Sequence, residues 1–201
     1  LILDEADRML DMGFIKDVNF LCNAVPVERQ TLCFSATITP DIQKLINGLL
    51  KNPVTCSVRT NTNNDHIHQS VIEAGDKHEK VEQLHDLLIK PEVSKAIVFM
   101  RTKWSAQKLS DQLVKRGFKS EAIHGNKSQP QRQKALNAFK ADKINVLVAT
   151  DVAARGLDIP EVSHVINFDE PETYDDYIHR IGRTGRAGLG GNAVTFVAKR
   201  S

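Results

Sequence analysis

Short runs of apolar residues recur along the chain, separated by stretches in which apolar residues follow a helical spacing. The runs lack strict alternation of apolar and polar positions, which is typical of strands covered on both faces of a parallel sheet. We therefore expect strands at residues 1–3, 31–34, 54–58, 96–99, 146–149, 165–168 and 194–197. The alternation of these strands with helices predicts an α/β fold built on a parallel sheet.

Capping residues mark where several helices begin and end. Thr39 followed by Pro40 predicts a helix start, because threonine is a good N-cap and proline suits the first helical position. The other signals are two capping-box pairs and a glycine suited to a left-handed helix end: Asp76 with Glu79, Ser128 with Gln131, and Gly117 after a helix from about Lys103. That last helix also carries Trp104, which we expect to pack as an anchor rather than to stack on bases.

One polar stretch divides the chain. Residues 59–65 contain no apolar residue and no helical period, which is typical of an exposed linker. We therefore expect residues 1–58 to belong to a first domain, residues 59–66 to form a linker, and residues 67–201 to form a second domain. The first part holds too few strands for a complete doubly wound sheet, whereas the second holds nearly enough.

Composition changes this picture little. The 201 residues carry a net charge of +2, without the strong basic excess of many nucleic-acid-binding domains, so charge is neutral about partners. The three cysteines form no close-spaced pair, and we expect reduced thiols in a cytoplasmic protein. No apolar run approaches the ~20 residues of a membrane helix. The sequence begins at Leu1, inside a strand-like run without a leader, and we expect it to be a truncated piece.

An acidic segment, Asp4-Glu5-Ala6-Asp7, directly follows the first predicted strand. Carboxylates at the carboxyl end of a parallel strand lie where open α/β sheets bind ligands. An aspartate there can hold Mg²⁺ between two phosphates, and a glutamate can orient or deprotonate the attacking water. Acidic residues are also favoured in the first turn of any helix. Both interpretations remain open on these four residues alone.

Two further polar segments follow predicted strands. Ser35-Ala36-Thr37 can relay hydrogen bonds from a nucleotide site, or simply form the turn that leads to the next helix. Within residues 149–158, Thr150 can donate to a backbone phosphate and Asp158 can accept from a ribose hydroxyl. The structural alternative for this second segment is a capped helical turn with an Asp–Arg pair.

The strongest chemical signal is the segment His-Arg-Ile-Gly-Arg-Thr-Gly-Arg at residues 179–186. Guanidinium groups fit phosphate oxygens bidentately, so such a cluster can neutralise charge that develops on a transferred phosphoryl group. A solvated basic turn is the alternative. It gives no reason to interleave Gly182 and Gly185 with the arginines, and we therefore favour a phosphate-binding role.

Four segments in this order resemble the DEAD-box RNA helicases over essentially the whole chain: residues 4–7, 35–37, 154–158 and 179–186. Residues 10–14 and 124–129 are most similar to the bacterial RhlE subgroup. The resemblance implies two RecA-like domains, the first incomplete here and the second nearly complete, that close over ATP and single-stranded RNA. In the intact parent, ATP hydrolysis would be coupled to local unwinding or remodelling of RNA.

The resemblance also implies a role for individual residues. Asp4 would bind Mg²⁺, Glu5 would serve the attacking water, and two arginines would reach the γ-phosphate, namely Arg183 and Arg186. Asp158, beside Gly156, would bind the ribose of ATP. The polar contact that links the two domains would be formed by Asp7, Ser35, Thr37 and His179. RNA would be bound through its sugar-phosphate backbone by Thr150, Asp151, Gly125, Gln129, Arg132 and Thr102.

One family feature is missing from the 201 residues. No G-x-x-x-x-G-K-[ST] phosphate loop occurs, and the family's phosphate loop and adenine-reading segment lie upstream of the acidic motif. We therefore expect this polypeptide to lack ATPase activity that its parent has. Two other functions remain open: a DNA helicase or translocase of the same superfamily, whose acidic and arginine motifs usually differ, and a non-enzymatic product that binds RNA or protein partners through residues 67–201.

Overall fold

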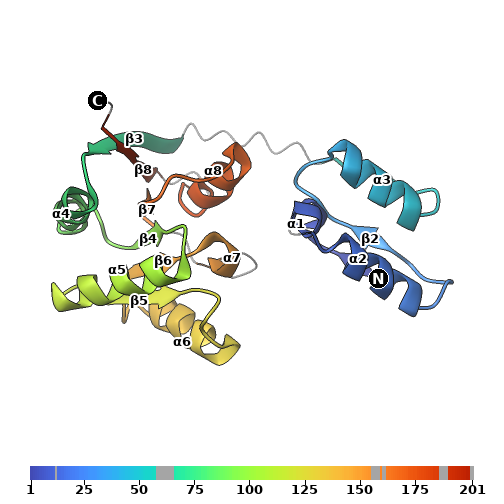
Figure 1. The fold of residues 1–201 in the computed structure, drawn as a ribbon, viewed down its shortest axis with the longest axis horizontal. Helices are drawn as coiled ribbons and strands as arrows, with labels where there is room; N and C mark the ends of the chain where they lie inside the picture. Colours follow the sequence, from blue (N-terminus) through green and yellow to red (C-terminus); the bar gives the residue numbers. More distant parts are fainter. Residues whose placement is uncertain (12, 58–65, 155–158, 160–161, 186–189, 200–201) are drawn as a thin grey trace. The chain divides into compact units, whose positions relative to one another are not determined.

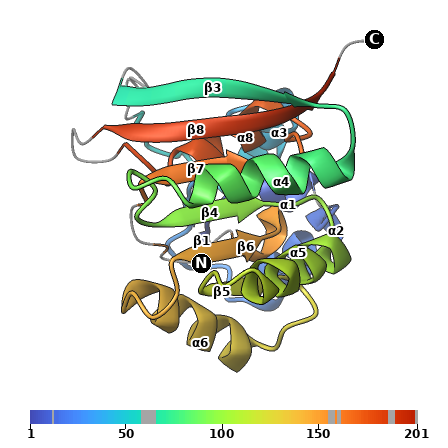
Figure 2. The same ribbon diagram turned by 90° about the vertical axis from the view of Figure 1, so that its left-hand side faces the viewer.

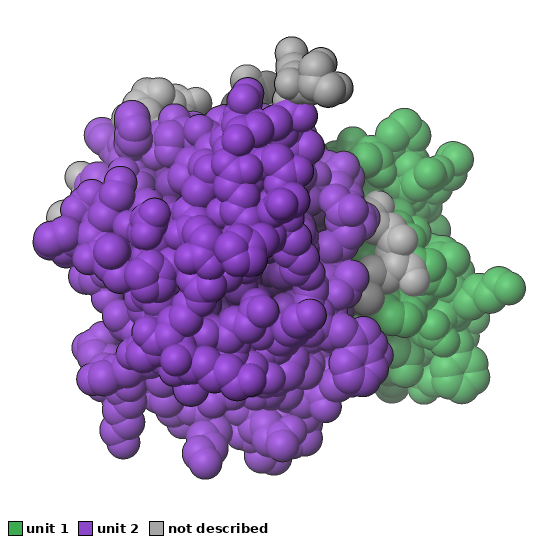
Figure 3. Space-filling model, turned by 60° about the vertical axis from the view of Figure 1, so that its left-hand side comes forward, with its two compact units in different colours: residues 1–59 green, residues 60–201 purple. Residues whose placement is uncertain are grey.

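The chain forms two compact units, residues 1–59 and residues 60–201, which are coloured separately in Figure 3. This computed structural model describes residues 1–11, 13–57, 66–154, 159, 162–185 and 190–199. The predicted linker, residues 59–66, lies outside the described residues except for His66. Each unit is an α/β arrangement and is described here by itself (Figure 1).

The first unit is a short parallel sheet with three helices. Strand β1 (Ile2–Leu3) pairs with β2 (Leu32–Cys33), helices α1 (Ala6–Asp11) and α2 (Ile15–Ala24) lie between them in sequence, and α3 (Pro40–Leu49) follows. The predicted start of α3 is confirmed, because the Thr39 hydroxyl accepts a hydrogen bond from Ile42 N over 3.3 Å. The buried apolar core of this unit consists of Leu3, Ala6, Val18, Cys22, Ile42 and Leu45.

The second unit is built on a parallel sheet of six strands in the order β3-β8-β7-β4-β6-β5 (Figure 2). Its strands are β3 (Ile67–Ala74), β4 (Ala96–Phe99), β5 (Ser120–Ile123), β6 (Val146–Ala149), β7 (His164–Asn167) and β8 (Gly191–Ala198). The central strands β4, β6 and β7 are buried at every residue, as the unbroken apolar runs of β4 and β6 predict, and β7 also buries the polar His164 and Asn167. The predicted α/β fold with a parallel sheet is therefore confirmed.

Helices cover both faces of this sheet. One core cluster joins the sheet to α4 (Lys77–Leu88) and α5 (Lys103–Lys115), and Figure 2 shows both helices in front of the strands. Other clusters join the opposite face to α6 (Gln129–Lys140), α7 (Asp151–Ala154) and α8 (Tyr174–Ile181). Neighbouring residues of one strand point to opposite faces, so Ile97 and Val98 of β4 belong to different clusters. Two core layers therefore hold the sheet.

Helix boundaries follow the predicted capping signals. Asp76 Oδ1 accepts from Glu79 N over 2.8 Å at the start of α4, and Ser128 N donates to Gln131 Oε1 over 2.8 Å at the start of α6. Gly117, just beyond α5, has a φ of +92°, the left-handed conformation expected of a glycine at a helix end. These predicted ends are confirmed.

The strand predictions fail in two situations: where a strand of the sheet contains many polar residues, and where an apolar run does not pair with another strand. Strands β3 and β5 lie at the two edges of the sheet and alternate or mix polar with apolar residues, so neither shows an unbroken apolar run. Conversely, the predicted strand at residues 54–58 is wrong over its described part, residues 54–57, which are exposed and form no strand. Val54 is 89% exposed, so its β-branched side chain has no sheet to pack against.

The packing role expected of Trp104 is also wrong. Its side chain lies in the first turn of α5 and is 71% exposed, whereas the buried side of that helix is formed by small and aliphatic residues such as Ala106 and Leu109. Among the described residues, no helix has the length and apolar character needed to cross a bilayer.

Candidate functional site

In the first unit, the acidic segment and the Ser-Ala-Thr segment leave adjacent strands at the same edge. Strands β1 and β2 are parallel, with Leu3 opposite Cys33, so residues 4–7 and residues 35–37 follow neighbouring strand ends. The pairing continues one residue further, because Phe34 N donates to the Leu3 carbonyl over 2.8 Å. The structure therefore brings these two predicted segments together.

Asp7 is the buried centre of this region, with 8% of its surface exposed. One of its carboxylate oxygens accepts from the backbone N–H and from the hydroxyl of Thr37, each over 2.9 Å. The Ser35 hydroxyl donates to the Thr37 carbonyl over 2.7 Å. Burial alone would raise the pKa of Asp7, but hydrogen bonds from Thr37 and Arg8 outweigh it and hold that pKa below its usual value. Asp7, Ser35 and Thr37 thus form one hydrogen-bonded cluster.

Asp4 and Glu5 are exposed just beyond β1. Asp4 Oδ1 accepts a hydrogen bond from Glu5 N over 3.0 Å. Glu5 has a φ of 51°, in the left-handed region that residues with a side chain rarely adopt, and such strain concentrates at functional sites. Among the described residues, no cluster of three or more His, Cys, Asp or Glu side chains could hold a metal ion. Mg²⁺ is commonly held by one or two carboxylates together with phosphates, so Asp4 fits an ion that arrives with ATP.

In the second unit, three predicted RNA-binding residues follow neighbouring strands. Thr102 lies after β4 and caps α5, where its hydroxyl oxygen accepts from Ser105 N over 3.1 Å. Thr150 follows β6 and is buried, whereas Gly125 follows β5 and is exposed. A Cβ at Gly125 would meet no atom within 4 Å, so the backbone there is open to a ligand. Because the strands are parallel, all three residues lie at the carboxyl edge of the sheet, where α/β folds bind ligands.

Two further predicted RNA-binding residues lie in the first turns of α6, the helix that follows Gly125. Gln129 begins α6 and is exposed. Arg132 is half-buried, and its Nε donates to the Lys127 carbonyl over 3.2 Å. This bond holds the side chain of Arg132 against the loop that carries Gly125. The fold therefore gathers these residues around one loop.

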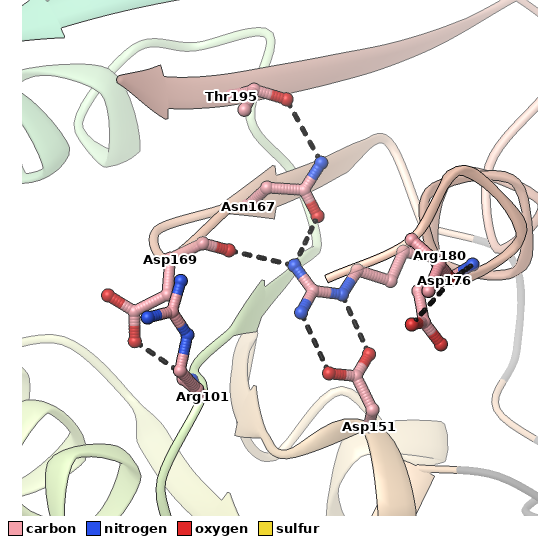
Figure 4. A network of polar contacts seen from close by, with 8 residues as sticks. Arg101, Asp151, Asn167, Asp169, Asp176, Arg180 and Thr195 are labelled. Atoms are coloured by element: carbon pink, nitrogen blue, oxygen red, sulfur yellow. Dashed lines mark hydrogen bonds and ion pairs between the residues drawn. The ribbon is translucent and has the colours of Figure 1, made fainter. Parts of the chain in front are cut away.

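A buried arginine on α8 anchors the loop that follows β6 (Figure 4). Arg180 is 2% exposed, and two of its guanidinium nitrogens donate to the two carboxylate oxygens of Asp151, each over 2.7 Å. Its third nitrogen donates to Asn167 Oδ1 over 3.1 Å and to the Asp169 carbonyl over 2.8 Å. The guanidinium carbon lies 5.1 Å from the centroid of the Phe99 ring. A bidentate pair with these supports fixes the orientation of both partners.

This ion pair was missed by sequence reasoning, which placed Asp151 on the RNA track and counted Arg180 only as a member of the phosphate-binding cluster at residues 179–186. Both carboxylate oxygens of Asp151 are engaged by Arg180, which lies 29 positions further along the chain. The structural alternative for this segment, an Asp–Arg pair, is therefore formed with a distant partner. Arg180 is buried beside Ile181, where an unpaired guanidinium would be costly, but only the structure reveals this burial.

The arginine segment continues from the end of α8, and its backbone is hydrogen-bonded to Val162, which lies two residues before β7. The Arg183 carbonyl accepts from Val162 N over 3.1 Å, and the hydroxyl of the buried Thr184 donates to the Val162 carbonyl. Arg183 is half-buried, and His179 is exposed on α8. The contacts fix the backbone from which the Arg183 side chain extends.

The glycines of the arginine segment have packing reasons that the sequence did not reveal. Gly185 has a φ of +68°, and a Cβ there would lie 2.6 Å from Ile67 Cγ1 on β3. A Cβ at Gly182 would lie 3.2 Å from the Ile178 carbonyl oxygen. The inference that these glycines mark close approach of a ligand is therefore weakened, because close approach of the protein itself already requires Gly185.

Three predicted site residues, Arg186, Gly156 and Asp158, lie outside the described residues. Of the others, His179 lies on α8 and Arg183 just after it, and the rest form two local groups. The first contains Asp4, Glu5, Asp7, Ser35 and Thr37 in the first unit. The second contains residues on or next to the carboxyl edge of the six-stranded sheet: Thr102, Gly125, Gln129, Arg132, Thr150 and Asp151.

Two family models match the chain. Residues 79–188 match the helicase conserved C-terminal domain, and residues 1–45 match the DEAD/DEAH box helicases. The yeast DEAD-box splicing factor Prp28 is 42% identical to this chain, with a TM-score of 0.66, over 98% of this chain and 45% of that chain. A DEAD box protein from the hyperthermophile Methanococcus jannaschii is also 42% identical, with a TM-score of 0.64, over 99% of this chain and 53% of that one.

A third solved structure, S. cerevisiae Dbp5 bound to RNA and ADP BeF3, is 33% identical, with a TM-score of 0.82, over 99% of this chain and 53% of that chain. The chain spans about half the length of these relatives. It nevertheless matches a helicase C-terminal domain over more than half of its own residues, with the DEAD segment in its expected place ahead of it. The chain therefore belongs to the DEAD-box helicase family.

Proposed function

We propose that this chain is part of an ATP-dependent RNA helicase, in which ATP hydrolysis is coupled to local unwinding or remodelling of RNA. The first unit supplies groups for Mg²⁺ and the attacking water. The second unit supplies arginines for the γ-phosphate and a surface for the RNA backbone. Family membership supports this assignment, and Dbp5, a relative of the same fold, has been solved with RNA and ADP BeF3.

The Arg180–Asp151 pair is the observation that carries this proposal. Arg180 lies three residues before Arg183, the proposed γ-phosphate ligand, and Asp151 directly follows Thr150, a proposed RNA ligand. The bidentate ion pair therefore ties the phosphate-binding segment to the RNA-binding loop through buried, oriented bonds. A displacement of the phosphate-binding segment would therefore also displace the RNA-binding segment, as coupling between ATP and RNA requires.

The remaining roles follow the chemistry of each residue. We assign Asp4 to Mg²⁺, Glu5 to the attacking water, and Arg183 with Arg186 to the γ-phosphate. Asp158 with Gly156 is assigned to the ribose of ATP. Coupling between the units is assigned to the cluster of Asp7, Ser35 and Thr37 together with His179.

RNA is proposed to bind through its sugar-phosphate backbone along the carboxyl edge of the second sheet. Its ligands are assigned as Thr102, Gly125, Gln129, Arg132 and Thr150. Asp151 receives a changed assignment: its carboxylate is fully engaged by Arg180, so we propose that it positions Arg180 and Thr150 rather than touching RNA.

Two finer points belong to the proposal. The segments at residues 10–14 and 124–129 favour an RhlE-like bacterial helicase. The cysteines Cys22, Cys33 and Cys56 are all free thiols, which favours a reducing compartment such as the cytoplasm. The 201 residues hold no G-x-x-x-x-G-K-[ST] loop, whose backbone amides and lysine cradle the phosphates, and we propose that this polypeptide alone does not hydrolyse ATP.

Phosphate release tests the proposal. In the intact helicase, Arg183→Ala should lower RNA-stimulated turnover by ~10³-fold or more, because it removes a cation from the charge that develops on the γ-phosphate. Arg116→Ala is the matched control, since Arg116 forms a surface pair with Glu82 and should leave turnover nearly unchanged. Loss of only a few-fold for Arg183→Ala would remove it from the site. Stimulation by DNA as strong as by RNA would favour a DNA translocase, and comparable turnover by the 201-residue chain would refute its proposed inactivity.

A further inference from the structure

The second unit exposes a large aromatic ring beside its proposed RNA-binding edge. Trp104 is 71% exposed in the first turn of α5, two residues beyond the cap residue Thr102. Leaving an indole in water forgoes the substantial stabilisation that its burial would give. The ring is therefore available to a ligand, and the helix fixes the backbone that carries it.

Trp104 lies at one end of a groove along the outer side of α5. The groove has a volume of about 380 Å³ and is lined at helical spacing by Trp104, Gln107, Lys108, Asp111, Gln112 and Lys115. Apart from the indole, these side chains are amides and charged groups rather than aliphatic residues. The amino group of Lys103 also lies 5.8 Å from the centroid of the indole ring. An aromatic face set among two lysines, two amides and one carboxylate suits a nucleotide better than an apolar peptide side chain.

One residue of the groove contacts the loop that carries Gly125. Gln107, which lines the groove, places its Oε1 atom 3.0 Å from Nε2 of His124, the residue before Gly125. His124 is buried, with 6% of its surface exposed, so this contact joins the helix firmly to the loop. Burial, aided by the charges of Lys127 and Lys103, holds the pKa of His124 below its usual value, which keeps the ring neutral near pH 7. The Gln107–His124 contact thus joins α5, which Thr102 caps, to the loop that carries Gly125.

We propose that Trp104 stacks on one base of the RNA strand whose backbone follows Thr102 and Gly125. The inference rests on the proposed function and adds a base contact to a surface otherwise expected to bind only the sugar-phosphate backbone. Lys103 and Lys108 supply positive charge for the flanking phosphates. Because every base has an aromatic face, the contact strengthens binding without reading sequence.

The chain's single tryptophan makes the proposal directly measurable, because emission from the 201-residue chain reports on Trp104 alone. A short oligouridylate should quench this emission as it binds. An oligomer with the same sugar-phosphate backbone but no bases should bind without quenching, and about 5-fold or more weakly, the loss expected for one stacked base. Fluorescence anisotropy of labelled oligomers measures binding independently of the indole.

Variants separate stacking from general effects of substitution. Trp104→Phe should retain part of the affinity for oligouridylate, whereas Trp104→Leu should lose about 5-fold or more and should not weaken binding of the abasic oligomer. Val114→Ala is the matched control: Val114 is an exposed apolar residue of the same helix, outside the groove lining, and its loss should leave both affinities unchanged.

The possible outcomes separate the stacking proposal from the proposed function. Binding of oligouridylate with unchanged indole emission, or equal affinity for the abasic oligomer, would overturn the stacking proposal and leave the proposed function standing. Failure of both oligomers to bind would overturn both the stacking proposal and the proposed binding of RNA along this edge. A Trp104→Leu variant that sediments differently but binds RNA normally would show that the groove instead holds a second copy of the chain.

Discussion

Removing the carboxylate of Asp151 should destabilise the second unit strongly. In an Asp151→Ala variant, the guanidinium of Arg180 would lose two hydrogen bonds of 2.7 Å while it stays 2% exposed. Removing one partner of a buried ion pair costs about 3–5 kcal/mol, because the other charge remains out of water. The bonds to Asn167 and the Asp169 carbonyl persist, and the side chain of Asp151 is 25% exposed, so the lower end of that range is expected.

Thermal and urea unfolding followed by circular dichroism would measure this loss. A loss of about 3 kcal/mol lowers the midpoint temperature by roughly 6–12 °C for a unit of this size. Asp151→Asn should lose less than Asp151→Ala, because an amide oxygen can still accept one bond from Arg180. Exchange of both Arg180 and Asp151 for apolar residues should recover part of the loss, since no unpaired charge then remains buried.

A matched surface pair provides the control. Arg116 and Glu82 form the same bidentate arrangement, but the side chain of Glu82 is 45% exposed. Glu82→Ala should therefore change the midpoint little, because water replaces the lost contact. If Asp151→Ala shifts the midpoint no more than Glu82→Ala, the buried pair does not anchor the loop after β6, and the argument for coupling through it fails.

Two further predictions concern stability. The pKa of Asp7 in the folded state lies below its unfolded value, so the stability that its carboxylate contributes is present above about pH 4 and is lost as the pH falls through the folded pKa. In an Asp7→Asn variant, acid unfolding of the first unit should lack this pH-dependent contribution. Identical pH profiles for the two proteins would contradict the prediction. Gly191→Ala would place a Cβ 2.3 Å from Thr184 Oγ1 and should cost about 1–3 kcal/mol, whereas Gly190→Ala meets no atom within 4 Å. Equal midpoints for these two variants in thermal unfolding would show that the strand can shift without cost.

Sequence patterns predicted the interior of the fold better than its borders. The strands β4, β6 and β7 are covered on both faces. Strands β4 and β6 accordingly consist of unbroken apolar runs, whereas β7 buries a polar residue at each end. Edge strands β3 and β5 bury only part of their surface and leave no such run. Val54 shows the converse error, because apolar character without a pairing partner does not make a strand.

The site residues that could be predicted are those whose positions follow from a predicted strand. Polar residues placed directly after predicted strands, such as Asp4 and Thr150, could be assigned to an edge because parallel strands end together. The partner of Asp151 could not, since nothing local indicates a guanidinium 29 residues away. The exposure of Trp104 was equally hidden, because one aromatic residue in a helical pattern looks the same whether its face of the helix is covered or bare.

Glu5 adopts a backbone conformation that is costly for a residue with a side chain. Glycine would adopt the φ of 51° at that position more cheaply, since it has no Cβ to crowd the peptide. The chain instead carries a carboxylate there, exposed and adding nothing to the apolar core. Glu5→Gly should therefore relieve the backbone strain at this position while it removes the carboxylate that we propose serves the attacking water.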